Sequence, residues 1–297
     1  MIDTKSDKKL LNIAFSGGST SAFMTKWILE NKSNEWDEIV VTFANTGQEH
    51  EKTLEFVNKC DIDFNFNVVW LEADVVHEKR KGTKHKIVDY QNCSRKGEPY
   101  EEVIKKYGIP NNAYPHCTRE LKLQPIKSYL RSIGWKKDSY YTAIGIRIDE
   151  VDRINSKMNE LKLWYPLCED VKVTKGDIRD FWDKQSFKLG LDEHYGNCVW
   201  CWKKNKRKLM TLALSDPKIF EFPKKMESLY STNGANGEYE GGRVFFRNKQ
   251  STSDLLHDAT TTSFTKFDQS QVNWGDCYKY DDSLDKANGC SESCEVY

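Results

Sequence analysis

The stretch NIAFSGGSTSAFMTKWIL, residues 12–29, joins two segments whose apolar residues follow different periodicities. Residues 10–15 form a short, almost continuously apolar run, which predicts a buried strand. From Ser19 onward, apolar residues recur at the spacing of a helix. Between the two stand Gly17 and Gly18 among four hydroxyl residues, a composition that suits neither a strand nor a helix interior. We therefore predict a strand, a glycine-rich loop and a helix in succession.

A loop in this position has the chemistry of an anion site. The first N–H groups of a helix have no partner within the helix, and the helix dipole adds partial positive charge there. Glycines leave the backbone open to an anion, and hydroxyl groups can donate further hydrogen bonds. The Gly-Lys-Ser/Thr ending of a Walker A loop is absent, and a tight turn with no ligand is the alternative. The residues predicted to contact phosphates are Ser16, Gly17, Gly18, Ser19, Thr20 and Ser21.

Strand and helix patterns alternate along the chain. The apolar patterns predict strands at 38–47, 66–73 and 139–147, and helices at 49–60, 98–108 and 174–185. This alternation predicts an α/β fold with a doubly wound, mostly parallel sheet. Such a sheet binds its ligand outside the carboxyl ends of the strands, where the strand order reverses.

Two further segments would lie at that edge with the glycine-rich loop. Asn45, Thr46 and Gly47 end the second strand, and Gly145 and Arg147 end a later one. Arg147 offers a planar guanidinium for phosphate or sulfate, although a surface ion pair with a neighbouring acid is the alternative. The other candidates are Arg119 and Lys122, which could add positive charge, and Glu150, which could hold Arg147 or contact a magnesium ion.

Composition bounds the partners and the compartment. The 297 residues carry 45 basic and 45 acidic side chains, a balance that argues against a polyanionic partner for the whole chain. Residues 251–297 hold nine acids and three lysines, so the rest is mildly basic. No apolar run approaches the roughly 18–20 residues of a membrane span, and the N-terminus lacks a signal-peptide core, so we expect a cytoplasmic protein. Nine cysteines there favour metal, cluster, redox or buried-thiol roles over disulfides.

Five ordered segments resemble the PP-loop superfamily of ATP pyrophosphatases and, within it, the phosphoadenylyl sulfate (PAPS) reductase-like proteins that phages and prophages often encode. They are SGGSTS (16–21), ANTGQEHEKT (44–53), CTRELKLQP (117–125), GIRIDEVDR (145–153) and WYPLCEDVKVTKGDIRDFW (164–182). The resemblance implies an adenine nucleotide alpha hydrolase-like fold that binds ATP, PAPS or adenylyl sulfate. Thr20 stands where the superfamily usually has the Asp that helps to place magnesium, so magnesium-assisted release of pyrophosphate stays open.

Changes in composition divide the chain into three regions. We expect residues 1–170 to form the nucleotide-binding core and residues 171–228 to form a helical subdomain that contains cysteines. A Gly/Asn-rich stretch then leads into polar and finally acidic sequence. Residues 229–297 are therefore expected to be a linker and an acidic tail, either an appendage or partly disordered.

Cys198-x-x-Cys201 and His116-Cys117 resemble the segments that hold a [4Fe–4S] cluster in the iron–sulfur reductases for adenylyl sulfate, which have Cys-Cys in place of His116-Cys117. Three cysteines and a histidine could hold such a cluster or a structural zinc ion, and three cysteines alone could leave one iron open. Buried thiols are the other alternative. The basic residues in 203–208 could offset a negative cluster, receive phosphates of a nucleotide or nucleic acid, or form a solvated helix face.

The C-terminal cysteines allow a catalytic interpretation. The sulfate reductases of this family carry a catalytic cysteine on a C-terminal tail, in an E-C-G context that is absent here. By position the candidates are Cys294 and Cys290. A thiol with no role and a pair that relays persulfide sulfur are the alternatives. Glu292 and Glu295 would disfavour a thiolate at Cys294 and oppose nucleophilicity.

Three functions follow as hypotheses. The leading one is a PAPS reductase-like enzyme of sulfur transfer or reduction, in which a thiolate attacks sulfur, sulfite is released and a thioredoxin-like protein restores the thiol. The second is an ATP-dependent enzyme that thiolates nucleic acid with sulfur from a donor. The third is a nucleotide-binding module with structural zinc and no turnover. A homodimer is a further expectation.

Overall fold

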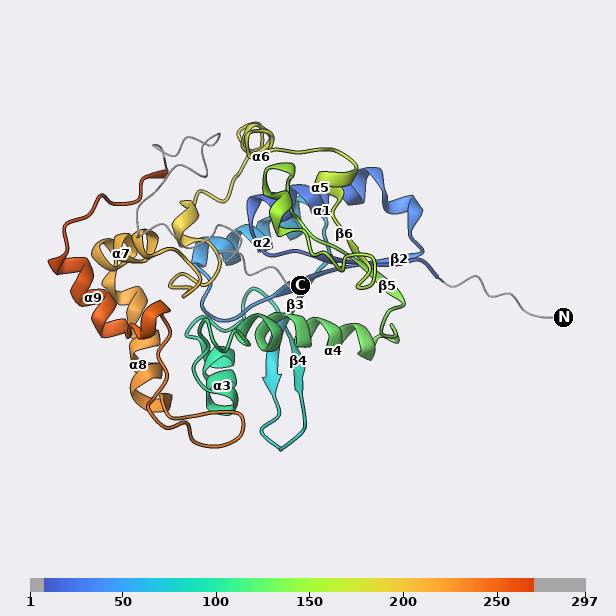
Figure 1. The fold of residues 1–297 in the computed structure, drawn as a ribbon. Helices are drawn as coiled ribbons and strands as arrows, with labels where there is room; N and C mark the ends of the chain where they lie inside the picture. Colours follow the sequence, from blue (N-terminus) through green and yellow to red (C-terminus); the bar gives the residue numbers. More distant parts are fainter. Residues whose placement is uncertain (1–7, 270–297) are drawn as a thin grey trace.

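The computed structural model describes residues 8–269, in which a six-stranded sheet lies between helices on both of its faces (Figure 1). The strand order is β4-β3-β2-β1-β5-β6, and every pair is parallel except β3 with β4. The strands are β1 (Leu10–Ala14), β2 (Glu38–Ala44), β3 (Val68–Val75), β4 (Thr83–Val88), β5 (Tyr140–Ala143) and β6 (Leu163–Trp164). The predicted α/β fold with a doubly wound, mostly parallel sheet is confirmed.

The central strands are covered on both faces, which is why they appear in the sequence as apolar runs rather than as alternating patterns. All five residues of β1 are buried. β1 pairs with β2 on one side, with Leu10 opposite Glu38, and with β5 on the other, with Leu10 opposite Tyr140. The one polar side chain of β1, Asn12, accepts a hydrogen bond from the hydroxyl of Thr42 at 2.9 Å.

Nine α-helices within residues 8–269 surround the sheet or pack beside it (Figure 1). They are α1 (Ser19–Asn31), α2 (Glu51–Phe64), α3 (Glu98–Tyr107), α4 (Gln124–Ser132), α5 (Pro166–Glu169), α6 (Lys175–Trp182), α7 (Lys206–Ser215), α8 (Glu221–Tyr230) and α9 (Thr252–Thr261). The shorter turns are η1 (Ser33–Glu35), η2 (Arg119–Leu123), η3 (Ile148–Arg153), η4 (Glu193–Tyr195), η5 (Pro217–Phe220) and η6 (Arg247–Lys249). Among residues 8–269, no helix has the length and apolar character needed to cross a membrane.

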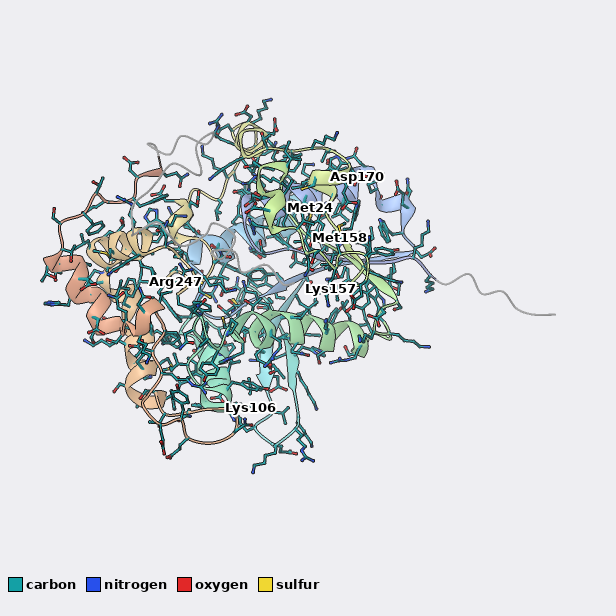
Figure 2. The ribbon with its side chains drawn as sticks, in the orientation of Figure 1. Met24, Lys106, Lys157, Met158, Asp170 and Arg247 are labelled. Carbon is teal, nitrogen blue, oxygen red and sulfur yellow. The ribbon has the colours of Figure 1, made fainter. Side chains whose placement is uncertain are left out.

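The helices bury an apolar stripe against each face of the sheet. On one face, Met24 of α1, which is labelled in Figure 2, shares a core with the sheet and with Leu54 of α2 and Trp182 of α6. On the other face, Ile126 and Leu130 of α4 pack against the strands. The sheet is therefore wound on both sides, as a parallel sheet requires.

The topology creates one switch point, beside β1. The chain leaves β1 through α1, β2 and α2 toward β3 and β4, and then returns through α3 and α4 to place β5 on the opposite side of β1. The connections that follow β1 and β5 therefore diverge at the carboxyl edge of the sheet. This is the crevice in which doubly wound folds bind their ligands.

The C-terminal helices form a second core together with α3. Trp200, Phe220 and Phe245 are fully buried there, and α9 packs along α7 (Figure 1). Arg247, which is labelled in Figure 2, donates a hydrogen bond from its guanidinium to the carbonyl oxygen of Lys203 at 2.9 Å. The described part of the region expected to be a linker and tail thus packs closely as far as α9, because its apolar side chains complete this core. The boundaries at residues 170 and 228 stay predictions.

Candidate functional site

The glycine-rich loop follows β1 and opens α1, and Gly17 fixes its shape. Gly17 has a φ of +80°, the left-handed region that favours glycine. A Cβ there would lie 2.9 Å from Cγ2 of Thr53 and 3.0 Å from Cγ2 of Val57, both on α2. Gly17 is therefore needed to pack the loop against α2, rather than to make room for an anion as the sequence suggested.

Gly18 is the glycine that leaves the loop open. It is the extended residue before α1, with a φ of −91° and a ψ of 159°. Among the described residues, only Oγ of Ser16 lies within 4 Å of a Cβ built on Gly18, at 3.7 Å. In the same part of the chain no side chain caps α1, and its first turn contains no acid. The N-terminus of α1 therefore presents its N–H groups and partial positive charge, as an anion site requires.

The hydroxyl groups of the loop divide into two roles. Oγ of Ser21 donates to the carbonyl oxygen of Gly18 at 3.0 Å, and accepts from the backbone N–H of Ser16 at 3.2 Å. Oγ of Ser16 lies 2.9 Å from the same hydroxyl. Ser16 and Ser21 thus hold the loop together, whereas Ser19 and Thr20 are half-buried at the start of the helix.

Arg147 reaches the loop from the end of β5, across the switch point. Its guanidinium donates to Oγ1 of Thr20 at 3.0 Å, and its side chain is 12% exposed. It also forms a two-point ion pair with Asp149 at 2.9 and 3.0 Å and lies 3.1 Å from Glu150. Burial would lower the pKa of Arg147, but these carboxylates outweigh it and raise the pKa above its usual value. The guanidinium is held rigidly beside the residue that replaces the usual Asp.

Gly145 allows the chain that follows β5 to approach α1 closely. A Cβ on Gly145 would lie 3.2 Å from Cα of Ser21. Glu150, predicted to hold Arg147 or a magnesium ion, pairs with both Arg147 and Arg153. The structure therefore brings the loop, Gly145, Arg147 and Glu150 into one neighbourhood.

The Asn-Thr-Gly segment is buried and internally bonded. Nδ2 of Asn45 donates to Oε1 of Glu72 at 2.7 Å, and the hydroxyl of Thr46 donates to Oε1 of Glu49 at 2.8 Å. Gly47 has a φ of +76°, and a Cβ there would lie 3.0 Å from the backbone of Gly97. These residues shape the edge of the sheet. Sequence reasoning missed Glu72, because nothing in an apolar strand marks which acid will be buried.

The cysteine loop docks on this segment. The N–H of Val199 donates to the carbonyl oxygen of Gln48 at 2.9 Å, and the indole N–H of Trp200 donates to Oε1 of Gln48 at 2.5 Å. Sγ of Cys198 lies 3.3 Å from the hydroxyl of Thr46. The two segments predicted from separate motifs are thus in direct contact.

Cys117, Cys198 and Cys201 lie in the same buried cluster, each at most 6% exposed. His116 does not complete a metal set with them. Its Nε2–H donates to the carbonyl oxygen of Gly108 at 3.1 Å, and burial lowers its pKa to about 4, so the imidazole is neutral. Within residues 8–269, no group of three or more His, Cys, Asp or Glu side chains is arranged to hold a metal ion. The structure therefore gives no support to the predicted iron–sulfur cluster or to zinc.

The remaining cationic candidates lie on η2 or donate hydrogen bonds to other groups of the protein. Arg119 and Lys122 lie on η2, a one-turn π-helix that packs against α3, β3 and α4. The basic residues of 203–208 do not form an unpaired stripe, because each of them donates a hydrogen bond to a neighbouring group. Lys203 donates to Thr118, Lys204 to three carbonyl oxygens, Lys206 to Asp258, Arg207 to Thr265 and Lys208 to Glu193. Cys290 and Cys294 lie outside the described residues.

Glu193 joins Lys208, from the basic segment 203–208, to Lys175, which the sequence did not single out. Its carboxylate accepts from Nζ of Lys175 at 2.5 Å and from Nζ of Lys208 at 2.9 Å. Burial would raise the pKa of Glu193, but the charges of Lys208 and Lys175 lower it to about 2. The three residues come from η4, α6 and α7, so only the fold brings them together.

This ion pair should make stability depend on pH. A carboxyl group whose pKa falls from 4.5 to about 2 on folding contributes stability above pH 4.5 and loses it as pH falls toward 2. We expect Glu193→Gln to cost about 1–2 kcal/mol at pH 6, after allowance for a side chain that is 37% exposed, and less than half of that at pH 3. Urea unfolding at the two pH values measures the difference. An equal cost at both would contradict it.

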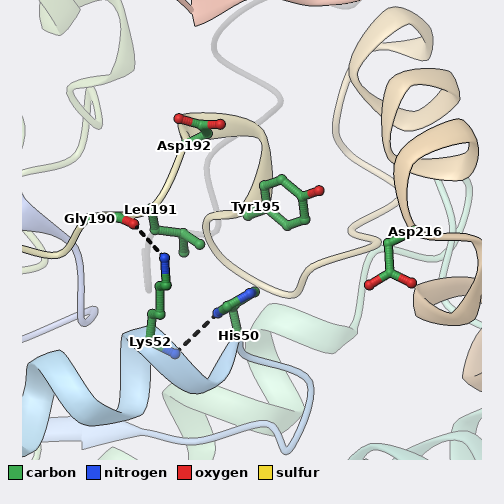
Figure 3. Close-up of a pocket in the computed structure, with 7 residues that line it drawn as sticks. All are labelled: His50, Lys52, Gly190, Leu191, Asp192, Tyr195 and Asp216. Carbon is green, nitrogen blue, oxygen red and sulfur yellow. Dashed lines mark hydrogen bonds between the residues drawn. The ribbon is translucent and has the colours of Figure 1, made fainter.

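An open pocket of about 290 Å³ lies where α2 begins (Figure 3). Its lining residues are His50, Lys52, Gly190, Leu191, Asp192, Tyr195 and Asp216. Nδ1 of His50 accepts from the backbone N–H of Lys52 at 3.1 Å, and Nζ of Lys52 donates to the carbonyl oxygen of Gly190 at 3.0 Å (Figure 3). Burial is the main reason why the pKa of His50 is lowered. The segment that carries Glu193 is thus one wall of this pocket.

A glycine-rich loop after the central strand, an uncapped helix and an arginine from across the switch point define a nucleotide-binding protein of the PP-loop class. Residues 10–162 match the model of the phosphoadenosine phosphosulfate reductase domain, and the chain belongs to that family. This confirms the resemblance found in the sequence motifs.

The relatives include a phage protein, as the motifs predicted. The chain is 28% identical to the uncharacterized nin region protein ORF290 of Escherichia phage lambda, over 96% of this chain and 94% of the relative. It is 31% identical to the uncharacterized protein MJ0973 of Methanocaldococcus jannaschii over 48% of this chain and 27% of that protein. A second protein of that organism, MJ0066, is 27% identical over 53% of this chain and 29% of its own length.

Proposed function

We propose that this chain binds an adenine nucleotide through the N-terminus of α1 and uses it in sulfur transfer or reduction. The observation that carries the proposal is the open, uncapped start of α1 at Gly18, with the guanidinium of Arg147 fixed on Thr20 at 3.0 Å. Free N–H groups, helix dipole and guanidinium all favour a phosphate or sulfate at one point. Membership of the PAPS reductase family supports ATP, PAPS or adenylyl sulfate as the ligand.

The proposed chemistry needs a thiol beside the bound nucleotide. In the reductase version, a thiolate attacks the sulfur of the sulfonyl group, the S–O bond to the nucleotide breaks, and the enzyme holds a thiosulfonate. A thiol of a thioredoxin-like partner then attacks the enzyme sulfur, forms a disulfide and releases sulfite. Cys290 or Cys294 would supply the first thiolate. In the alternative, ATP-dependent thiolation of nucleic acid, ATP activates the acceptor with loss of pyrophosphate and a donor supplies the sulfur.

The binding step is tested by placing a methyl group on Gly18. Gly18→Ala meets no atom closer than 3.7 Å within the described chain and has a negative φ, so the fold should be kept. We expect ATP and PAPS to bind at least about tenfold more weakly, because the methyl group occupies the space over the helix N-terminus. Calorimetric titration of both ligands measures the affinity, and a thermal melt checks the fold.

Gly82→Ala is the matched control. Among the described residues nothing lies within 4 Å of a Cβ there, and Gly82 lies between β3 and β4, outside the nucleotide site. Its affinity for ATP and PAPS should equal that of the wild type. Affinities for Gly18→Ala within twofold of the wild type would overturn the assignment of the loop. Failure of the wild type to bind ATP, PAPS or adenylyl sulfate would overturn nucleotide binding itself.

The sulfur step is tested separately. Full-length protein purified without oxygen is given PAPS and a thioredoxin with its reductase, and sulfite is measured. Sulfite that disappears in Cys294→Ala or Cys290→Ala supports reduction. Tight nucleotide binding without sulfite formation would leave two functions, thiolation of nucleic acid or nucleotide binding without turnover. Iron, acid-labile sulfide and zinc, measured in the wild type and in Cys198→Ala, then show whether any metal accompanies the buried cysteines.

A further inference from the structure

Two lysines converge on one carboxylate beside the candidate nucleotide site. Nζ of Lys175, on α6, and Nζ of Lys208, on α7, donate to different oxygens of Glu193 at 2.5 and 2.9 Å. The Lys208 side chain is only 9% exposed, whereas that of Glu193 is 37% exposed. Lys208 is therefore more deeply buried than the carboxylate that neutralises it. A buried ammonium needs a negative partner, and the more exposed carboxylate is the part that can be exchanged.

The lysines lie within electrostatic reach of the loop that opens α1. Burial is the main cause that lowers the pKa of Lys175. Glu193 opposes this effect, while the charges of Arg147 and Lys208 add to it. The charge of Glu193 also helps to raise the pKa of Arg147. The guanidinium of Arg147 donates to Oγ1 of Thr20 in the loop at 3.0 Å. α6, which carries Lys175, also packs on α1, where the indole N–H of Trp182 donates to the carbonyl oxygen of Ser19 at 3.0 Å. The two lysines are therefore connected to the loop by packing of α6 on α1 and by the charges of Arg147 and Glu193.

The carboxylate lies on a short segment beside the open pocket. Glu193 opens η4, a single turn between the pocket and the lysines. Its neighbours Asp192 and Tyr195 line the pocket of about 290 Å³, and Lys52 donates to Gly190 at 3.0 Å at the start of the same segment (Figure 3). The segment is thus tied down by lysines on both sides, with open space next to it.

We propose that Lys175 and Lys208 form a second oxyanion subsite, which binds a further phosphate or sulfate group of the nucleotide, and that Glu193 fills it in the free protein. A tetrahedral oxyanion accepts from two ammonium groups as the carboxylate does, and its second charge makes it the better partner for two cations, of which Lys208 is buried. This subsite rests on the proposed function, because the loop at α1 would hold the first phosphate. It would make the protein prefer nucleotides with two separate anionic groups over a simple monophosphate.

The test compares ligands that differ in their second anionic group. AMP, adenosine 3′,5′-bisphosphate and ATP are titrated into the full-length protein and its variants at one salt concentration. Lys208→Met should weaken binding of the bisphosphate, of ATP or of both by about tenfold while changing AMP binding less than twofold. Glu193→Gln should tighten the same ligand several-fold, because it removes the competing carboxylate. Whether the bisphosphate or ATP responds shows where on the nucleotide the second group lies.

Controls separate this subsite from a structural ion pair. Lys188→Met removes a lysine between α6 and η4 that is 62% exposed and pairs with Asp183 at 3.0 Å, and it should change no affinity. If Lys208→Met does not fold, Lys175→Met, on a side chain that is 30% exposed, carries the same expectation. Variants that alter AMP, bisphosphate and ATP equally, or a Glu193→Gln variant that binds no ligand more tightly, would overturn the subsite. Failure of the wild type to bind any of the three would instead overturn the nucleotide site.

Discussion

Gly17→Ala should destabilise the protein by about 2–5 kcal/mol. Two costs add at this residue. A left-handed backbone, with φ at +80°, costs a non-glycine residue about 1–2 kcal/mol. The new methyl group would also lie 2.9 Å from a methyl of Thr53, 3.0 Å from a methyl of Val57 and 3.1 Å from the ring of Phe43. Overpacking of this kind typically costs about 1–3 kcal/mol.

The neighbouring glycine supplies the contrast. Gly18→Ala places the same methyl group where the nearest described atom is 3.7 Å away and φ is negative, so its unfolding free energy should stay within about 1 kcal/mol of the wild type. Urea unfolding followed by tryptophan fluorescence measures both variants. The two glycines thus have opposite roles, one in stability and one in binding. Equal stability losses in the two variants would contradict this division.

The sheet could be predicted because its signals are local. The continuous apolar runs at β1, β2 and β3 are what a doubly covered parallel strand requires, and each run lies within one stretch of sequence. The helix from Glu98 was recognisable from its amphipathic pattern, and the box that caps α6 from Thr174 and Asp177. The loop at Gly17 and Gly18 followed from composition alone.

The elements that were missed lack such signals or contradict them. β4 carries three basic residues in six, as an exposed edge strand can, and therefore does not look buried. α4 begins at Gln124 directly after a π-helix and has Pro125 in its first turn, which obscures the helical periodicity. α9 lies in a stretch that reads as a polar tail, although Ser251 and Asp254 form the capping box that could have revealed it.

The site could be predicted only as far as single motifs allow. Sequence placed Arg147 at the sheet edge, but its bond to Thr20 joins residues 127 positions apart. The lysines of 203–208 looked like a solvated or phosphate-binding stripe because their partners are far along the chain. Asp258 pairs with Lys206 at 2.6 Å, and Glu193 pairs with Lys208 at 2.9 Å. Such partners are set by packing, which no local pattern encodes.

Lys204→Met should cost about 3–5 kcal/mol and loosen the cysteine loop. Lys204 is 5% exposed, and its ammonium donates to the carbonyl oxygens of Gly196, Cys198 and Val199 at 2.8–2.9 Å. Methionine has a similar length but donates nothing, so the carbonyl oxygens of Gly196 and Val199 lose this donor, and that of Cys198 keeps the N–H of Cys201 at 2.9 Å. Each buried acceptor left unsatisfied costs about 1–3 kcal/mol, and water reaching the half-buried ones recovers part of the sum.

A second measurement distinguishes loosening of this loop from general destabilisation. Because the three carbonyl groups define the path of the chain around Cys198 and Cys201, thiol labelling of the native protein, read by mass spectrometry, should become faster at these two residues than at Cys60, which lies in the sheet core. Lys206→Met is the control, since it removes a lysine that is 38% exposed and pairs with Asp258, and should cost at most about 1 kcal/mol. Labelling that rises equally at Cys60 would mean that Lys204 stabilises the whole fold. A rise confined to Cys198 and Cys201 would mean that one buried ammonium keeps these thiols in place beside the proposed nucleotide site.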